Sequence, residues 1–334
     1  MKIIKNIIEY LKSEYKFIIL CILVVFISLY KLPYNLYTGG GILDISDKVE
    51  VYNGYKSNGS FNMCYVKQVR ATIPTYLLSY IFNWDREKVS ASLIDENDTP
   101  EDLWQRERLY MDEANTSAVI NAYRLANKDY KITSEKVIVL YLLPESITDL
   151  KVGDVILNAD SETIDSLEDL TIIANRHKEG DKISFKVLRD GKEIDCYAEI
   201  IKVDKTLKVG IAVIKNYEYA TAQEVKFNFD NNEAGPSGGL MLSLEIYNQL
   251  VSDDITNGYK IAGTGTIDEN GNVGTIGGVK YKLKGAVNDK AKVFFVPTGN
   301  YDEAIEYKNK NNYEIEIVKV NNINEAINYL KEMK

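Results

Sequence analysis

The chain has 334 residues, a formal net charge of −9 and a single histidine, His177. This length is sufficient for about two domains with hydrophobic cores. The acidic balance argues against a nucleic-acid partner, which needs a basic face. With one histidine, HExxH zinc chemistry is excluded, and a Ser–His–Asp triad could use only His177. No cofactor, metal or disulfide framework is expected from the spacing of the three cysteines, Cys21, Cys64 and Cys196.

The beginning of the chain predicts a membrane anchor. Residues 1–16 carry four lysines and two glutamates, and residues 17–30 carry no charge. Extending the apolar segment to 17–36, with Lys31 snorkelling, reaches about the 20 residues that a membrane span needs. The lysines in front favour a cytoplasmic N-terminus, so we expect a single-pass protein of the cell membrane with an extracytoplasmic ectodomain. A cleaved signal peptide is the alternative, although residues 30–33 lack a small-residue cleavage site.

Residues 37–130 contain secondary-structure signals but no motif of their own. The glycine-rich residues 37–41 predict a short flexible link. Strand-like alternation follows between residues 48 and 66. A helical pattern then extends to residue 126, with Thr99 and Pro100 as a helix start signal.

Residues 131–204 form a compact unit in which strand, turn and helix signals follow one another. A helix is expected over 166–177, and a hairpin turn at Asp190-Gly191. The stretch LKVGDVILNADSETIDSLEDL, residues 150–170, resembles a PDZ domain of the bacterial type.

The PDZ resemblance implies peptide binding by strand addition, in which an extended peptide pairs with an open strand edge beside the helix. The expected groove residues are Val137, Val139, Tyr141, Leu167 and Leu170. The connection over residues 144–150 is short, so a helix usual in this family is expected to be missing. A PDZ fold that acts only as a spacer is the alternative.

Strands and helices alternate from residue 205 to residue 334, which predicts an α/β fold. Within this part, EAGPSGGLMLSLEIYNQL (residues 233–250) predicts a glycine-rich turn followed by a helix with one apolar face. Ser237 lies where the loop becomes the helix, and free amides with the positive end of the helix dipole can stabilise a developing negative charge there. The alternative is that Ser237 only caps the helix.

A second stretch, IAGTGTIDENGNVGTIGGVKYKLKGA (residues 261–286), predicts a strand, a hairpin turn, a short strand and a helix. Lys280 lies in the first turn of that helix, and Lys282 is expected to project away from the apolar face. If Lys280 is partly buried, its pKa is lowered and it can act as a base. A solvated surface lysine is the alternative. The expected apolar stripe consists of Val279, Leu283, Ala286 and Val287.

Taken together, GPSGGLM, IAGTGTI, GTIGGVK and KLKGA resemble the proteolytic domain of Lon-type serine peptidases, which use a Ser–Lys dyad. The resemblance implies Ser237 as nucleophile and Lys280 as general base, with Thr264 bonded to the lysine and Gly235 and Gly238 in supporting roles. Gly238 replaces an alanine frequent in the family and should loosen the helix start by up to about 1 kcal/mol. By analogy with membrane-anchored relatives, residues 37–130 would supply the first part of the protease fold.

These inferences combine into a membrane-anchored, ATP-independent serine endopeptidase of α/β fold with an inserted PDZ-like domain that selects substrate or partner. ATP independence rests on the absence of a GxxxxGK[ST] motif from the 334 residues. The expected partners are protein or peptide substrates and the membrane, without nucleic acid, and the oligomeric state is left open. The alternative function is a non-catalytic PDZ scaffold that holds membrane or envelope proteins.

Overall fold

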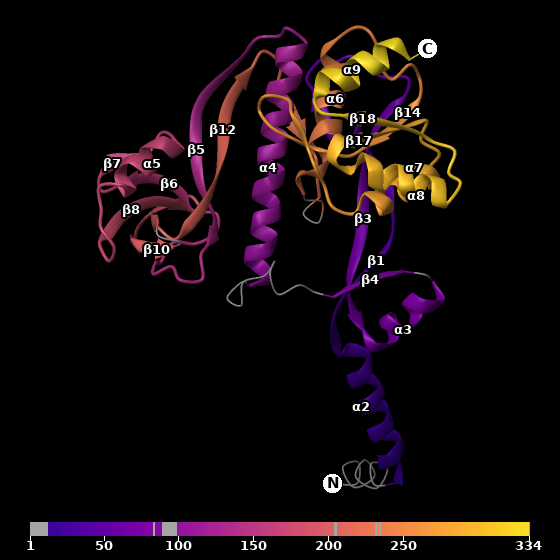
Figure 1. Ribbon diagram of the computed structural model, residues 1–334, viewed down its shortest axis with the longest axis horizontal. Helices are drawn as coiled ribbons and strands as arrows, with labels where there is room; N and C mark the ends of the chain where they lie inside the picture. The colour runs from indigo at the N-terminus through magenta and orange to yellow at the C-terminus, as the bar shows by residue number, and fades with distance from the viewer. Residues whose placement is uncertain are drawn as a thin grey trace, which may run out of the picture. The chain divides into compact units, whose positions relative to one another are not determined.

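A computed structural model describes residues 13–82, 84–88, 99–203, 206–230, 233 and 235–333. The chain divides into two compact units, which are taken one at a time (Figure 1). The first unit holds residues 1–40 and 66–93, and the second unit holds residues 41–65 and 94–334. Of the predicted cytoplasmic segment 1–16, residues 1–12 lie outside the described residues.

The first unit begins with helix α2, Tyr15–Leu29, which is followed directly by strand β1, Lys31–Asp44. A continuous helix over 17–36 is therefore wrong, because Tyr30 already has extended backbone angles, φ −66° and ψ 117°. Within the described part of the chain, no helix is long and apolar enough to cross a membrane. The predicted flexible link at 37–41 is also wrong, since these residues belong to β1.

The rest of the first unit is a strand pair and a short helix. β1 pairs antiparallel with β4, Asp85–Lys88. Strand β3, Ser60–Thr72, runs directly into helix α3, Ile73–Ile81. The backbone N–H of Thr72 donates to Thr75 Oγ1 at 2.8 Å, half of a capping box that marks where α3 starts.

The second unit is built on a parallel sheet in the order β18-β17-β14-β3. Successive residues of a strand point to opposite faces of a sheet. Accordingly, Phe295 packs with α6 and α9, whereas Phe294 packs with α7 and α8. Helices on both faces of a parallel sheet confirm the predicted α/β class. The elements are β14 (Lys260–Gly263), β17 (Val293–Pro297), β18 (Glu316–Val320), α6 (Gly239–Leu250), α7 (Val279–Asn288), α8 (Tyr301–Lys310) and α9 (Ile323–Glu332).

Short elements complete this unit around the long helix α4, Pro100–Leu125. The helix starts where the sequence predicts, because Thr99 Oγ1 accepts from the Asp102 N–H at 3.1 Å and an Asp102 carboxylate oxygen accepts from the Thr99 N–H at 3.0 Å. The short elements are β2 (Val49–Val51), β13 (Val225–Phe227), β15 (Thr266–Ile267), β16 (Val273–Gly274), η2 (Pro236–Gly238) and η3 (Thr298–Asn300).

Helix α6 is more deeply buried than a helix with one apolar face. Of its twelve residues, Gln249 is the one that is not buried. The sheet and α4 both pack against α6, so its polar residues are also taken into the core. The prediction of one apolar face therefore describes only part of this helix.

The burial of α6 removes a carboxylate from water. Glu245 is 2% exposed, and its Oε1 accepts from Gln249 Nε2 at 2.7 Å. Its Oε2 has no hydrogen-bond partner among the described residues. Burial, reinforced by the negative charges of Asp44 and Asp254, raises the pKa of Glu245 to about 7. The folded protein therefore favours the neutral form of this side chain.

We expect Glu245→Gln to stabilise the protein at pH 8 and to change little at pH 4. Because the folded-state pKa of Glu245 is raised, protonation of Glu245 stabilises the folded wild type below pH 4.5. This stability is lost as pH rises towards 7 and does not change further above it. The free energy of unfolding of the wild type should therefore differ by about 3 kcal/mol between the two ends of this range. Chemical denaturation at both pH values measures it, with Glu306→Gln, on an exposed side chain of α8, as the control. An equal effect of Glu245→Gln at both pH values would contradict this account.

Residues 130–221 of the second unit form another sheet, in the order β12-β5-β6-β8-β9. Helix α5, Leu167–Ala174, packs Leu170 and Ile173 into its core. Asp190 and Gly191 have φ of 51° and 73°, as the predicted hairpin turn requires. The strands are β5 (Tyr130–Leu142), β6 (Val155–Ala159), β7 (Glu162–Thr163), β8 (Lys182–Arg189), β9 (Lys192–Glu199), β10 (Ile201–Val203), β11 (Thr206–Lys208) and β12 (Ile211–Thr221).

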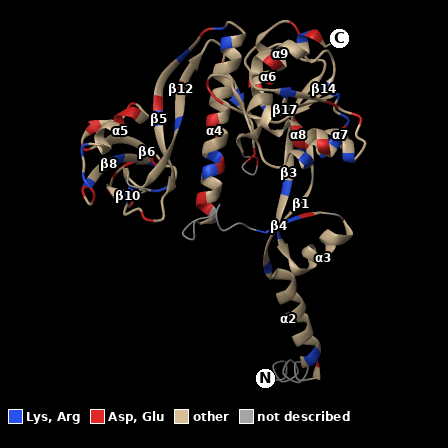
Figure 2. Cartoon of the chain, viewed as in Figure 1, with Lys and Arg blue, Asp and Glu red and all other residues tan. Residues whose placement is uncertain are grey.

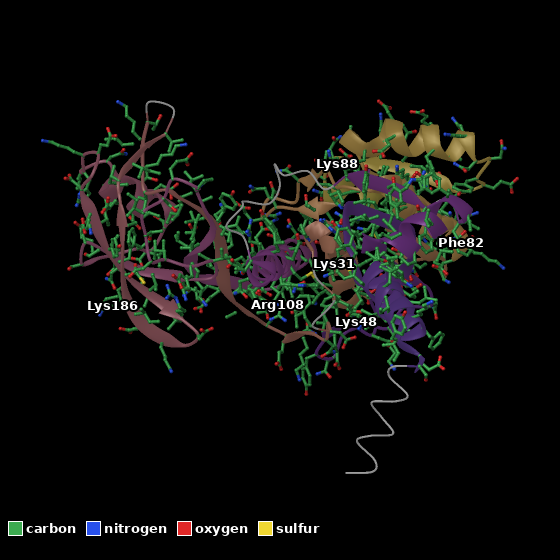
Figure 3. The ribbon with its side chains drawn as sticks, turned by 90° about the horizontal axis from the view of Figure 1, so that it is seen from below. Lys31, Lys48, Phe82, Lys88, Arg108 and Lys186 are labelled. Carbon is green, nitrogen blue, oxygen red and sulfur yellow. The ribbon has the colours of Figure 1, made fainter. Side chains whose placement is uncertain are left out.

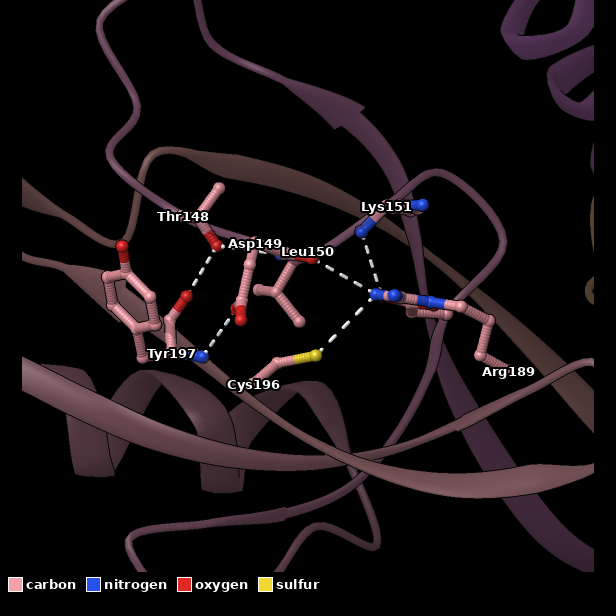
Figure 4. A network of polar contacts seen from close by, with 8 residues as sticks. Thr148, Asp149, Leu150, Lys151, Arg189, Cys196 and Tyr197 are labelled. Atoms are coloured by element: carbon pink, nitrogen blue, oxygen red, sulfur yellow. Dashed lines mark hydrogen bonds and ion pairs between the residues drawn. The ribbon is translucent and has the colours of Figure 1, made fainter.

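An ion pair between Asp154 and Arg189 holds the connection between β5 and β6, and Figure 4 labels Arg189 and its neighbours Lys151 and Cys196. Asp154 is fully buried, and Arg189 donates to it twice, from Nε at 2.7 Å and from Nη2 at 2.6 Å. The backbone N–H of Lys151 donates to the same carboxylate at 2.7 Å. Paired, hydrogen-bonded geometry of this kind offsets the cost of burying the charges. Residues 143–153, all described, contain turns and a β-bridge but no helix, as the sequence predicts.

Candidate active site

Ser237 lies in the middle of η2, which leads directly into α6. Gly235 precedes it with φ 125° and ψ 144°, a conformation that side chains rarely adopt. The side chain of Ser237 is partly buried. The serine therefore stands at the N-terminal end of a buried helix, near the positive end of the helix dipole.

Close packing explains the two glycines after the serine. A Cβ on Gly238 would lie 2.3 Å from Sδ of Met63, and a Cβ on Gly239 would lie 2.8 Å from Cγ2 of Ile267. Both separations are shorter than side chains tolerate, so an alanine at 238 would require Met63 to move. Met63 of β3 thus occupies the space that a side chain at position 238 would need, a contact that the serine motif alone does not predict.

Thr264 connects the serine turn to a lysine. Its Oγ1 donates to the carbonyl oxygen of Ser237 at 3.0 Å, and the N–H of Gly265 donates to the same oxygen at 2.8 Å. Lys282 Nζ donates to Thr264 Oγ1 at 3.0 Å. Thr264 is fully buried and Lys282 is 5% exposed. A buried ammonium or amine is therefore held two hydrogen bonds away from the main chain of Ser237.

The structure contradicts the prediction that Lys282 points away from the apolar face of α7. Lys282 follows Val279 by three residues and precedes Ala286 by four, so the three share one face of α7, and all are buried. Val287, which the predicted stripe includes, is only partly buried. The buried face of α7 therefore includes Lys282. Lys280 is half-buried, with its Nζ 4.8 Å from the ring centroid of Tyr281.

The surroundings of Lys282 favour its neutral form. Burial lowers the pKa of Lys282 to about 8, and a thiolate at Cys64 would act in the opposite direction. Cys64 is itself buried, however, which raises the pKa of its thiol to about 12. The thiol is thus uncharged near neutral pH and does not hold Lys282 as an ammonium. A lysine with this pKa can take up a proton in the range where a general base is needed.

Two other chemistries find no support at this site. His177 belongs to the sheet of residues 130–221, where its Nε2 lies 2.6 Å from Asp160 Oδ2. The parts of the chain that are described contain no group of three or more His, Cys, Asp or Glu side chains placed to hold a metal ion.

The predicted peptide groove lies on the wrong strand. β5 is paired on both sides, because Val139 exchanges hydrogen bonds with Asp154 and Gly153 on one side, at 2.9 and 2.8 Å, and pairs with Val213 of β12 on the other. Over residues 137–139, the backbone of β5 therefore has no free edge. Of the predicted groove residues, Val137, Val139 and Leu170 are core, Tyr141 pairs with Ala212, and Leu167 is exposed.

β12, unlike β5, has one edge without a strand partner in the described sheet. β12 lies at the end of the described sheet and has β5 as its one strand neighbour there. The start of α5 lies close by, because the Leu167 N–H donates to Glu135 Oε1 at 3.4 Å and Glu135 pairs with Tyr217 of β12. The strand order decides which strand has a free edge, and it could not be read from the alternation of apolar and polar residues within β5 or β12.

Two separate parts of the chain match known protein families. Residues 231–332 match the C-terminal proteolytic domain of Lon protease (S16), and residues 131–200 match the PDZ domain. The chain therefore contains a Lon-type C-terminal proteolytic domain and a PDZ domain. The Lon-type domain contains Ser237, Thr264 and Lys282, and the PDZ domain contains β5, α5 and the Asp154–Arg189 ion pair.

Three of the similar solved structures each cover about a quarter of this chain. The PDZ domain of an SdrC-like protein from Listeria monocytogenes is 22% identical over 25% of this chain and 93% of that chain, with a TM-score of 0.22. A protein from Geobacillus thermodenitrificans is 21% identical over 23% and 94%, with a TM-score of 0.22. The second domain of a Listeria protein is 21% identical over 26% and 88%, with a TM-score of 0.20. Likenesses at this level say nothing about activity. A comparison with curated protein sequences gives no match.

Proposed function

We propose that the chain is an ATP-independent serine endopeptidase in which Ser237 is the nucleophile and Lys282 the general base. The observation that carries this proposal is the buried Lys282, bonded to Thr264, which is bonded to the main chain of Ser237. A lysine desolvated in this way is suited to take the proton of a serine hydroxyl. ATP independence is proposed because the sequence contains no phosphate-binding GxxxxGK[ST] loop.

The proposed reaction uses the lysine twice. Neutral Lys282 accepts the proton of Ser237 Oγ as the oxygen attacks the peptide carbonyl, and backbone amides at Ser237 and Gly238 stabilise the oxyanion. Lys282 then returns the proton to the departing amine. In the second half-reaction, Lys282 activates a water molecule that releases the acyl group from Ser237.

We also propose that the PDZ domain selects substrates by adding a peptide strand to the outer edge of β12. Two observations support a connection with the Lon-type domain. Lys215 of β12 binds Glu269, in the turn between β15 and β16, at 2.7 Å. The chain that leaves β12 also continues through β13 into the serine turn.

A membrane location is proposed from the character of α2. None of its residues is buried, and its exposed hydrophobic side chains extend from Tyr15 to Leu29. A helix that is apolar all round needs apolar surroundings. With lysines at residues 2, 5, 12 and 16 on its N-terminal side, we propose that α2 and its neighbours anchor the chain and leave the PDZ and Lon-type domains outside the cytoplasm.

Covalent labelling tests the peptidase proposal. A fluorophosphonate probe is expected to modify Ser237 in the full chain, located by mass spectrometry of the labelled peptide, and the modification should be lost in Lys282→Ala. Peptide binding by the PDZ domain without any labelling of Ser237 would instead favour the non-catalytic scaffold.

A further inference from the structure

The first unit exposes a second apolar surface in addition to α2. Helix α3 contains no charged residue (Figure 2). On α3 and at its C-cap, large hydrophobic side chains are 40–72% exposed, and these are Leu77, Leu78, Tyr80, Ile81 and Phe82. A continuous apolar surface of this kind on a folded unit marks a contact with a protein or a membrane.

Aromatic rings gather around this surface. Tyr76 lies between Tyr34 and Tyr80, with ring centroids 5.0 and 5.7 Å away. Phe82 and Trp84 are stacked at 5.5 Å. Tyr34 belongs to β1, Tyr76 and Tyr80 belong to α3, and Phe82 and Trp84 follow α3 directly. Tyrosine and tryptophan are enriched where a membrane meets water, because each ring combines an apolar body with a polar group.

The charges beside α3 are mainly positive, although the whole chain is acidic. Among the described residues of the first unit after α2, two are anionic, Asp85 and Glu87, and the cationic ones are Lys31, Lys67, Arg70, Arg86 and Lys88. The guanidinium of Arg86 lies 4.0 Å from the ring centroid of Tyr80. Lys31, Lys88 and Phe82 are labelled in Figure 3. Cations that accompany an apolar surface suit anionic lipid headgroups.

We propose that α3, with Tyr80, Phe82 and Trp84, is an interfacial element that lies in the headgroup region of an anionic membrane. This inference rests on the proposed anchoring by α2. Helix α3 packs against α2, so insertion of α2 brings α3 to the membrane. Its nine residues are too few to span a bilayer, and they suit a helix that lies in the membrane plane.

Trp84 provides a direct test, because the sequence contains only one other tryptophan, Trp104. The full-length Trp104→Phe variant, which retains Trp84, is reconstituted into phosphatidylcholine–phosphatidylglycerol vesicles. We expect lipids brominated near the headgroup to lower Trp84 emission by at least about half, and by more than lipids brominated at the chain end. The matched control is Trp84→Phe, which retains Trp104 on α4 of the second unit, 52% exposed, and should be quenched less.

Charges introduced on α3 by substitution give a second test of its contact with the membrane. The pair of substitutions Leu77→Glu and Ile81→Glu should reduce the quenching of Trp84, whereas Ile172→Glu, on an exposed residue of α5, should not. Flotation of the vesicles separates the two proposals. Protein that floats while Trp84 stays unquenched overturns the role of α3. Protein that fails to float overturns the anchoring by α2, and with it the interfacial role of α3, whatever the peptidase activity.

Discussion

Replacement of Ser237 by alanine is expected to lower peptidase turnover at least about 10³-fold without loss of the fold. The substitution removes only Oγ. The carbonyl oxygen of Ser237, which accepts from Thr264 and Gly265, remains in place and continues to hold the turn. Turnover is measured with an unstructured protein substrate, and circular dichroism follows the fold.

The matched control is Ser243→Ala. Ser243 lies in the same buried helix, and its hydroxyl donates to the carbonyl of Gly239 at 2.8 Å, a bond that takes no part in the proposed chemistry. This variant is expected to stay within a few-fold of wild-type turnover. Wild-type turnover in Ser237→Ala would show that the nucleophile lies elsewhere.

The second large effect is expected at Lys282. Lys282→Met should keep the packing of α7 and lose at least about 10²-fold in turnover, because no base remains to accept the serine proton. Lys282→Arg should be similarly inactive at every pH, since a guanidinium keeps its charge. Lys280→Met, two residues away and half-buried, should stay close to wild type.

The pH profile gives the same base an independent test. Neutral Lys282 is the active form, and its pKa is lowered to about 8 by burial. Activity should therefore be low near pH 6, rise as pH increases through about 8, and level off above, as the amine loses its proton. A profile with no rise in this range would show that Lys282 is not the base. Inactive Lys280 variants together with active Lys282 variants would identify Lys280 as the base.

Local sequence patterns predicted several features correctly. The glycines at 235, 238 and 239 with Pro236 mark the turn at which α6 begins. Thr99 and Pro100 mark the start of α4, where Thr99 and Asp102 exchange hydrogen bonds. Asp190-Gly191 marks a hairpin. In each case the structure depends on residues within a few positions of one another, so a single sequence contains the information.

Other features depend on contacts between distant parts of the chain. The peptide edge of the PDZ domain depends on the pairing of β12 with β5, whose residues are separated by the whole domain. The first unit shows the same dependence, because the apolar segment after residue 17 ends at Leu29 and its glycine-rich continuation becomes a strand that pairs with β4. The alternation within a strand indicates which residues face the core, but not which strand lies at the edge.

The sequence by itself determined that a serine follows a glycine turn at the head of a helix, and that two lysines begin a later helix. Only the tertiary structure decided which lysine is buried. Lys280 and Lys282 are two positions, roughly 200°, apart around the helix and flank the apolar stripe on opposite sides, so the rotation of α7 about its axis decides which of them is buried. That rotation is set by the packing of Val279, Leu283 and Ala286 against the sheet and by the bond from Lys282 to Thr264, a residue on the strand side of the site.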